Sequence, residues 1–256
     1  MESPADFYDG LAATYHVLFD DWWAAAQWHG GVVAALLEAR GVVPPALLLD
    51  CTCGIGTQAL PLSALGYRVT GTDISAQAVV RARSEARARQ LPMRLEVADV
   101  RVVDQVLRER QFDAVISCDN ALPHLLTDAD LSLALRSVRR SLRDGGVFLA
   151  SIRDYDALEA ARLPGTPISM HGPPGRRYGS GQAWTWSPDG AYVDITLFVL
   201  REEAPGPGWG VSAHSTTYRT LRRAELTSAL NASGFPSVEW LSPRRSGYYQ
   251  PVVVAQ

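Results

Sequence analysis

The sequence has little of what nucleic-acid-binding, membrane-spanning and secreted proteins need. Its 256 residues carry a net charge of only −3, so no overall positive charge attracts a nucleic acid. No apolar run is long enough to span a membrane, and the acidic, aromatic N-terminus does not resemble a secretory leader. We therefore expect a cytoplasmic protein with neither a nucleic-acid nor a membrane partner.

Cysteine is also scarce. The chain has three cysteines, and two of them form the pair Cys51-x-Cys53. This spacing is not usual for zinc, and there is no second pair to complete a site. We expect buried thiols in a reducing compartment and no metal.

The most informative segment is residues 47–60, LLLDCTCGIGTQAL. An apolar run ends at Asp50, and a turn with Gly54 and Gly56 then opens a helical pattern. This order predicts a buried parallel strand that leads into a helix, at the place where open α/β sheets bind nucleotide-like ligands. The glycines permit a tight turn and a close approach of a ligand. A carboxylate at this position would repel a pyrophosphate, but it suits an ammonium group.

Two more acids follow at the ends of the next two predicted strands. Residues 67–73 read as a second strand that ends in Asp73, and residues 93–97 as a third, followed by Asp99. In such folds an acid after the second strand accepts hydrogen bonds from ribose hydroxyls. Asp99 could accept one from an adenine amino group. Three acids on successive strand tips predict a site for S-adenosylmethionine (SAM), with S-adenosylhomocysteine (SAH) as the product.

The N-terminal residues 5–40 look helical and are rich in aromatic rings, most of which should pack in the core or in a lid. Tyr8 and Tyr15 are candidates to lie over the cofactor, because an aromatic face or a phenol oxygen can favour a sulfonium. The predicted cofactor site joins these tyrosines to the strand tips and turn glycines: Tyr8, Tyr15, Asp50, Gly54, Gly56, Asp73, Ile74, Asp99, Val100 and Asp119.

A fourth and a fifth strand carry further polar groups at their ends. Residues 112–119 are a near-continuous apolar run, as a central parallel strand requires, and lead into a loop with Asn120 and His124. A helix that begins at Asp128 is predicted to end at the glycine pair 145–146. Residues 146–152 then form the fifth strand. Its tip, Arg153, should point into the crevice, where a planar guanidinium matches a carboxylate.

After Tyr155 the pattern changes. Residues 164–181 are dense in proline and glycine, which predicts a loop or lid. Residues 182–187 and 191–200 flank a Pro-Asp-Gly turn and read as a β-hairpin, and residues 211–220 as another antiparallel strand.

A helix over residues 224–233 and strands over residues 238–241 and 251–255 complete the chain. The predicted fold is α/β, a Rossmann-like, doubly wound, mostly parallel sheet with an antiparallel last strand. The expected domains are a helical N-terminal extension or lid, a core in two segments and a small antiparallel β insertion over the acceptor site. They span residues 1–40, residues 41–160 with 221–256, and residues 161–220, respectively.

The chain resembles the class I SAM-dependent methyltransferases, and within them the glycine and sarcosine N-methyltransferase group. The resemblance runs over nearly the whole chain. It is carried by residues 50–57 (DCTCGIGT), 71–75 (GTDIS), 112–125 (FDAVISCDNALPHL), 152–156 (IRDYD) and 246–251 (SGYYQP). In that group the residues matching Asn120 and Arg153 hold the carboxylate of an amino-acid acceptor, and the tyrosine matching Tyr8 lies close to the sulfonium.

The resemblance implies methyl transfer from SAM to the amine of a small, anionic, carboxylate-bearing acceptor, either a glycine-like amino acid or a natural-product intermediate. His124, Tyr248 or Tyr249 could accept or relay the amine proton. The candidate catalytic residues are Asn120, His124, Arg153 and Tyr248, and the candidate acceptor-binding residues are Asn120, Arg153 and Tyr249. A homo-oligomer is compatible with the sequence.

Three alternatives stay open. The first is an O-methyltransferase for a small carboxylate, phosphonate or hydroxyl compound. A nicotinamide oxidoreductase would use the same glycine turn, with Ala59 in the third glycine position, but Asp50 and Asp99 argue against it. A non-catalytic SAM-binding module would keep the three strand-tip acids and need neither Asn120 nor Arg153.

Overall fold

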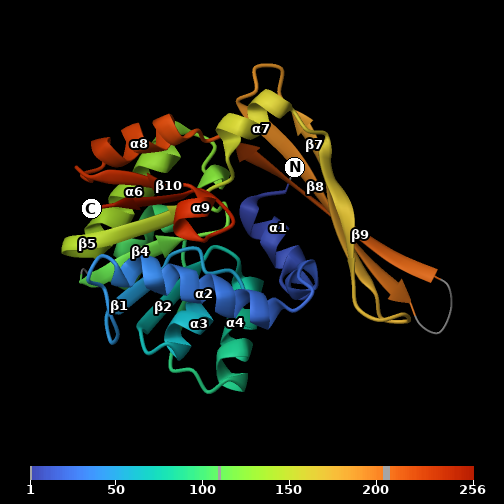
Figure 1. Cartoon of the computed structure of the whole chain (residues 1–256), viewed down its shortest axis with the longest axis horizontal. Helices are drawn as coiled ribbons and strands as arrows, with labels where there is room; N and C mark the ends of the chain where they lie inside the picture. The colour runs from blue at the N-terminus through green and yellow to red at the C-terminus, as the bar shows by residue number, and fades with distance from the viewer. Residues whose placement is uncertain (1, 109–110, 204–207) are drawn as a thin grey trace.

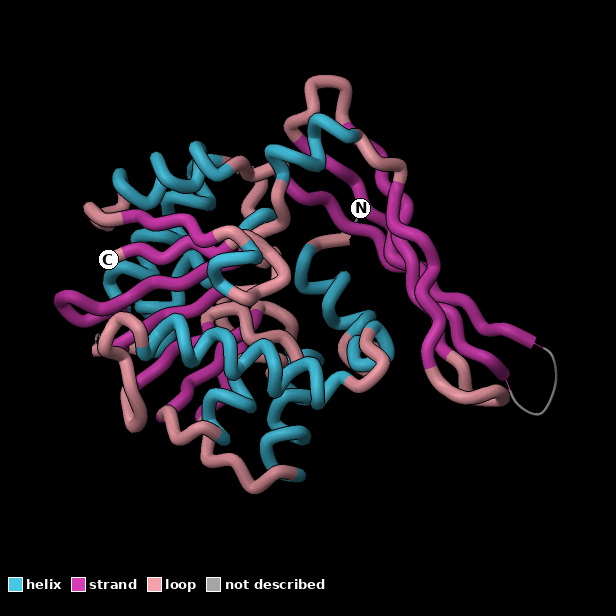
Figure 2. The backbone as a smooth tube through the Cα atoms, in the orientation of Figure 1, coloured by secondary structure: helices cyan, strands magenta, loops and turns pink. Residues whose placement is uncertain are grey.

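The computed structural model describes residues 2–108, 111–203 and 208–256. Figures 1 and 2 show a layered α/β core on one side, a long antiparallel sheet on the other, and an N-terminal helix between them. Among the described residues, no helix is both long and apolar enough to cross a membrane.

The core is built on a seven-stranded sheet. Its strands are β1 (Leu47–Asp50), β2 (Arg68–Asp73), β3 (Arg94–Val97), β4 (Phe112–Ser117), β5 (Leu142–Ser151), β10 (Val238–Leu241) and β11 (Val252–Ala255). Their order is β10-β11-β5-β4-β1-β2-β3. β1 pairs in parallel with β2 and β4, and β11 runs antiparallel between β5 and β10. The predicted Rossmann-like class and the antiparallel last strand are therefore confirmed.

Helices cover both faces of this sheet. One face packs against α2 (Trp22–Glu38), α3 (Ala59–Ala64) and α4 (Ala76–Ala88), and the other against α5 (Val103–Leu107), α6 (Asp128–Ser141) and α8 (Arg223–Ala232). Successive strand residues point to opposite faces, so Leu48 joins the first apolar cluster and Leu49 the second. This two-sided burial explains why the central strands read as continuous apolar runs.

Shorter helices and turns link these layers. They are α1 (Pro4–Leu11), η1 (Tyr15–Leu18), η2 (Val100–Val102), η3 (Leu122–His124), α7 (Tyr155–Ala161) and α9 (Pro243–Ser246). The helical pattern over residues 5–40 is thus three helices rather than one. Ser3 caps α1 and Asp21 caps α2, each accepting from a backbone N–H of the first turn. The helix that begins at Asp128 also ends earlier than predicted, because Leu142 already belongs to β5.

The second sheet has four antiparallel strands in the order β6-β7-β8-β9. They are β6 (Gly165–His171), β7 (Tyr178–Trp186), β8 (Tyr192–Glu203) and β9 (Gly208–Arg219). The predicted hairpin around Pro-Asp-Gly is the β7–β8 connection.

The predicted loop or lid over residues 164–181 is wrong, because most of it forms β6 and β7. Proline fits at Pro167 because β6 is an edge strand, and its pairing shifts register there. Gly179 and Gly181 of β7 leave room for the side chains of Met170 and Ile168, which an added Cβ would meet at 2.5 and 2.9 Å. The glycines therefore mark close packing between two strands, which the sequence pattern does not distinguish from a loop.

Candidate active site

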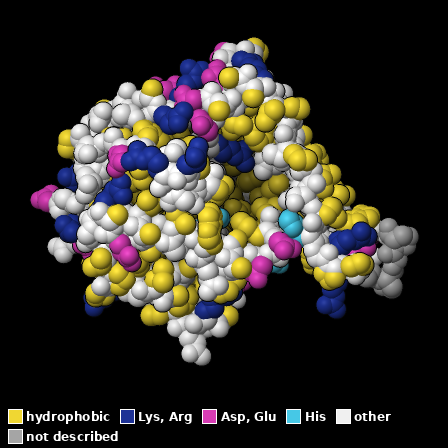
Figure 3. Space-filling view, viewed as in Figure 1, with side chains coloured by type: hydrophobic (Ala, Val, Ile, Leu, Met, Phe, Trp, Pro, Cys, Tyr) yellow, Lys and Arg dark blue, Asp and Glu magenta, His cyan; other side chains and the backbone are white. Residues whose placement is uncertain are grey.

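A cavity of about 450 Å³ lies at the carboxyl ends of β1, β2 and β4. The residues that follow these strands form one wall, and residues of α1 form part of the opposite wall. Figure 3 shows the surface hollowed between the core and the four-stranded sheet, with hydrophobic side chains in the hollow. Such a crevice is where open α/β sheets bind their ligands.

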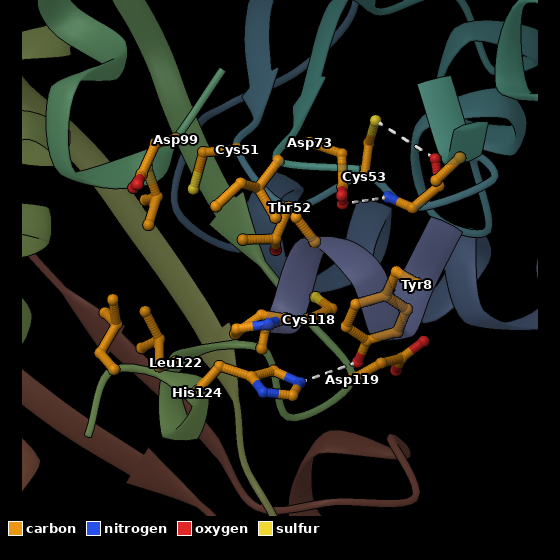
Figure 4. Close-up of a pocket in the computed structure, with 18 of the residues that line it drawn as sticks. Tyr8, Cys51, Thr52, Cys53, Asp73, Asp99, Cys118, Asp119, Leu122 and His124 are labelled. Carbon is orange, nitrogen blue, oxygen red and sulfur yellow. Dashed lines mark hydrogen bonds between the residues drawn. The ribbon is translucent and has the colours of Figure 1, made fainter. Parts of the chain in front are cut away.

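The turn after β1 is tied to the tip of β2. The backbone N–H of Gly54 donates to Asp73 Oδ2 at 2.8 Å (Figure 4), and that of Ser75 donates to Asp73 Oδ1 at 2.9 Å. Gly54 has a φ of +52°, and a Cβ added there would meet nothing described within 4 Å, so the backbone is open to a ligand. Gly56 has a different role: its φ is +99°, and a Cβ there would strike the side chain of Leu60 at 2.7 Å.

Asp50 is almost completely buried at the end of β1 and does not itself line the cavity. Its Oδ1 accepts from the Thr52 N–H at 3.3 Å, whereas Oδ2 has no partner in the described parts of the chain. Burial raises the pKa of Asp50 to about 8, and the charges of Asp73 and Asp119 add to this rise. Asp50 is therefore mostly protonated at neutral pH, and a cation that reached its free oxygen would favour the ionised form.

Asp99 and Val100 line the far end of the same cavity. The Asp99 carboxylate is held by Arg101, whose Nε contacts both oxygens at 3.1 and 2.9 Å. Arg101 Nη1 also donates to Asp130 at 2.6 Å. Any adenine amino group would therefore share Asp99 with Arg101, a neighbour that sequence reasoning missed.

Asp119 lies at the centre of a hydrogen-bond cluster. Its Oδ1 accepts from the hydroxyls of Tyr248 at 2.5 Å and Tyr249 at 2.9 Å, and its Oδ2 accepts from Gln58 Nε2 at 2.7 Å. Asp119 and Asn120 both have positive φ, at 59° and 68°. Two such residues in succession are strained, and strain of this kind gathers at functional sites.

The structure gives Asn120 internal partners. Its Oδ1 accepts from the Arg153 backbone N–H at 3.0 Å and its Nδ2 donates to the Tyr155 hydroxyl at 2.9 Å. The side chain is buried, so it braces the tip of β5. These two hydrogen bonds use Oδ1 and one N–H of Nδ2, so the other N–H of Nδ2 could donate to a substrate.

Arg153 projects between the core and the insertion. Its guanidinium carbon lies 5.2 Å from the ring centre of Trp184 and 5.5 Å from that of Tyr218, and Nη2 donates to Gln182 Oε1 at 3.3 Å. Nη1 is buried and has no partner among the described residues. The charge of Arg153 helps to lower the pKa of His124, so this cation is close to the groups that line the cavity.

Tyr8 and His124 meet at the cavity wall. The Tyr8 hydroxyl lies 3.1 Å from His124 Nε2 (Figure 4), and Thr216 Oγ1 is 3.5 Å from Nδ1. Burial first, and then the charge of Arg153, lowers the pKa of His124 to about 3, so the ring is neutral at neutral pH. Burial raises the pKa of Tyr8 and Tyr15, so both stay phenols.

The cavity wall includes nine of the predicted site residues: Tyr8, Tyr15, Gly54, Asp73, Ile74, Asp99, Val100, Asp119 and His124. Six lie outside the lining: Asp50, Gly56, Asn120, Arg153, Tyr248 and Tyr249. Sequence reasoning missed Gln58, Arg101, Asp130, Gln182, Trp184 and Tyr218. No cluster of His, Cys, Asp or Glu in the described ranges is arranged to hold a metal ion.

Comparison with known proteins agrees with this geometry. Residues 48–146 match the family model described as a methyltransferase domain. The glycine/sarcosine N-methyltransferase of Parasynechococcus marenigrum is 31% identical over 54% of this chain and 48% of its own length. The enzyme of that name from Aphanothece halophytica is 26% identical over 96% of this chain and 85% of its own. This chain thus matches only about half of the first relative.

A solved structure has the same architecture over almost the whole chain. CalS10, an amino pentose methyltransferase from Micromonospora echinaspora determined with SAM bound, superposes with a TM-score of 0.72 at 22% identity. The match covers 95% of this chain and 94% of CalS10. Residues 48–146 therefore match a methyltransferase domain, and the chain as a whole shares the fold of CalS10.

Proposed function

We propose that the protein transfers a methyl group from SAM to the amine of a small acceptor that also carries an anionic group. The observation that carries this proposal is the Arg153 guanidinium, which has one buried, unpartnered nitrogen at the tip of β5. A buried guanidinium nitrogen without a partner is costly unless an acceptor completes it. A carboxylate or phosphate oxygen on the substrate would do so.

The cofactor side fits SAM through three groups. Asp73 would accept from the ribose hydroxyls beside the two backbone N–H groups that it holds, Gly54 leaves the turn open, and Asp50 has an oxygen without a partner among the described residues. When bound, SAM supplies a methyl group on a sulfonium, which is already a reactive electrophile. The work left to the protein is alignment and the exclusion of water, and orientation alone can contribute roughly 7–11 kcal/mol.

The acceptor amine must be neutral to attack. His124 is neutral at neutral pH and shares the cavity wall with the phenol of Tyr8. These two groups can hold a neutral amine by hydrogen bonds without imposing a positive charge. Because the low pKa of His124 makes it a weak base, we assign it to orientation and leave the final proton to solvent.

The relatives support an amine acceptor, since two are named glycine/sarcosine N-methyltransferases and the superposed structure an amino pentose methyltransferase. The aromatic rings around Arg153 favour an acceptor that has a ring of its own, such as an amino sugar, over a glycine-like amino acid. Trp184 and Tyr218 flank the guanidinium, and the Trp184 indole N–H donates to Gln182 Oε1 at 2.9 Å. A ring-bearing amine is therefore a second candidate beside a glycine-like amino acid.

The test is methyl transfer from radiolabelled SAM to a panel of small molecules. The panel contains glycine, sarcosine, amino sugars with and without a phosphate, a phosphonate and a hydroxy acid. We expect label in anionic amines and little in their uncharged analogues. Transfer to the hydroxy acid or phosphonate alone would establish O-methylation instead. SAM binding without transfer to any compound, together with NAD titration as a control, would point to a binding module.

A further inference from the structure

The N-terminal helix α1 stands between the core and the four-stranded sheet (Figures 1 and 2). Residues of this helix and its flanks line the cofactor cavity: Ser3, Pro4, Ala5, Tyr8 and Ala12. The strand-tip residues Gly54, Asp73 and Asp119 line the same cavity from the core. A ligand held between these two walls would be covered by α1 on one side.

α1 is attached to the insertion by apolar packing. Phe7 and Leu11 are buried in one cluster with Leu197 and Val199 of β8. Gly10 lies so close to His214 of β9 that an added Cβ would be 2.9 Å from its Nδ1. Separating this side of the helix from β8 and β9 would therefore expose buried apolar side chains to water.

α1 is attached to the core by apolar and by polar contacts. Ala12 packs in the core cluster that contains Ala78, Tyr8 meets His124, and Asp9 makes the polar contact with α4. Asp9 Oδ1 accepts from Ser75 Oγ at 2.5 Å and from the Gln77 backbone N–H at 3.0 Å. Both donors belong to the beginning of α4, where Ser75 is the N-cap. A carboxylate is favoured there by the helix dipole and by the unpaired N–H groups of the first turn.

Ser75 connects this contact to the cofactor site. Its backbone N–H donates to Asp73 Oδ1, and Gly54 donates to the other oxygen of the same carboxylate. Ser75 therefore contacts both Asp9, which holds α1, and Asp73, which we expect at the ribose. Breaking the two hydrogen bonds to Asp9 would return both donors and the carboxylate to water, whereas separating α1 from β8 would expose the buried cluster.

We propose that Asp9 is the latch of a cover formed by α1, and that cofactor exchange requires its contacts with Ser75 and Gln77 to open. Asp9 does not line the cofactor cavity, so it acts as a positioning residue. The inference rests on the SAM site of the proposed function and is independent of the acceptor.

Stopped-flow binding of SAH to Asp9→Ala, followed by protein fluorescence, tests this latch without turnover. Asp6→Ala is the matched control, because Asp6 is on the same helix but its side chain contacts Ser3 rather than α4. Opening the cover more often should raise the association and dissociation rate constants together, each at least fivefold, with a smaller change in Kd. Asp9→Asn should fall in between, because its amide oxygen can still accept both hydrogen bonds.

Three results would overturn the latch. Rate constants within twofold of wild type would show that Asp9 does not limit exchange. A faster dissociation with unchanged association would make Asp9 a support of the bound state only. An equal effect of Asp6→Ala would assign the change to the stability of α1. Failure of wild-type protein to bind SAH would refute the cofactor site itself, a different result from any of these.

Discussion

The Tyr248 hydroxyl donates to Asp119 Oδ1 at 2.5 Å, although 129 positions separate the two residues in the chain. This contact joins the end of β4 to the segment before β11, so the last part of the chain supports the loop that follows β4. Tyr249 and Gln58 donate to the same carboxylate. With three donors, Asp119 is a fixed anchor for the strained loop that leads to His124.

The anchor can be tested by removing single hydroxyls. Tyr248→Phe should lower the free energy of unfolding by about 1.5–3 kcal/mol, since it removes a buried hydroxyl that donates to the Asp119 carboxylate. Tyr249→Phe should cost less, because Tyr249 is half exposed and water can replace its hydroxyl. Urea unfolding of the cofactor-free protein measures both. Equal losses would show that burial does not set the strength of these bonds.

Asp73→Ala tests the cofactor side. The mutation removes the expected acceptor for the ribose hydroxyls and also frees the N–H of Gly54 that the carboxylate now holds. Binding of SAH should weaken by roughly 1.5–3 kcal/mol, the range for hydrogen bonds to a charged group. Calorimetric titration measures this loss, with Asp144→Ala as the control because the Asp144 side chain is fully exposed. An unchanged affinity in folded Asp73→Ala would remove Asp73 from the site.

Asp50 predicts a pH dependence of stability. Its pKa is about 8 in the folded protein and about 3.9 in an unfolded chain. Between these values the folded state keeps a proton that the unfolded state has lost, so the free energy of unfolding falls as pH rises through this window. The limit is roughly 1.4 kcal/mol for each pH unit. Asp50→Asn should be more stable than wild type near pH 8 and similar to it near pH 4.

Asp50 should also make the affinity for SAH depend on pH, and this affinity should rise with pH whereas the stability falls. An ammonium group selects ionised Asp50, so the affinity of wild-type protein for SAH should rise from pH 6 to pH 8 with release of a proton. Calorimetry in buffers of different ionisation enthalpy detects this proton. Asp50→Asn should bind SAH more weakly and without the pH dependence. A parallel dependence in the variant would assign the proton to another group.

The core strands, and the acids that stand at the ends of three of them, could be predicted from the sequence because their signals are local. The central strands β1 and β4 are short, largely apolar runs. Asp50 and Asp73 are the last residues of β1 and β2, and Asp99 stands two residues after β3. The topology then brings their ends to one edge of the sheet. Capping residues and turn glycines give the same local information about where the helices begin.

The acceptor side could not be predicted in the same way, because its contacts join distant parts of the chain. Asn120 matches a substrate-binding residue by resemblance, yet its amide is engaged by Tyr155 and by the backbone of Arg153. Trp184 and Tyr218 reach Arg153 only because the four-stranded sheet folds over the core. The alternation of residues along a strand predicts which face of the sheet is buried, but it does not predict how the four-stranded sheet packs on the core.

The class of acceptor is tested by Arg153→Lys, which keeps the positive charge and removes the planar fork. A lysine ammonium is a compact point charge and cannot reproduce a bidentate contact with a carboxylate or its stacking between Trp184 and Tyr218. The acceptor would then be held at the wrong distance and angle, so kcat and kcat/KM should both fall, by tenfold or more for a barrier increase of about 1.4 kcal/mol.

The binding of SAH should change little in this variant, because Arg153 does not line the cofactor cavity. Steady-state kinetics with the best anionic amine of the panel, beside calorimetry with SAH, separates the two effects. Gln182→Glu is a useful companion, since a carboxylate beside Arg153 Nη2 would compete with an anionic acceptor and should raise KM. Normal turnover of that acceptor by Arg153→Lys would mean that the guanidinium does not hold its anion, and would direct the search toward neutral amines and alcohols.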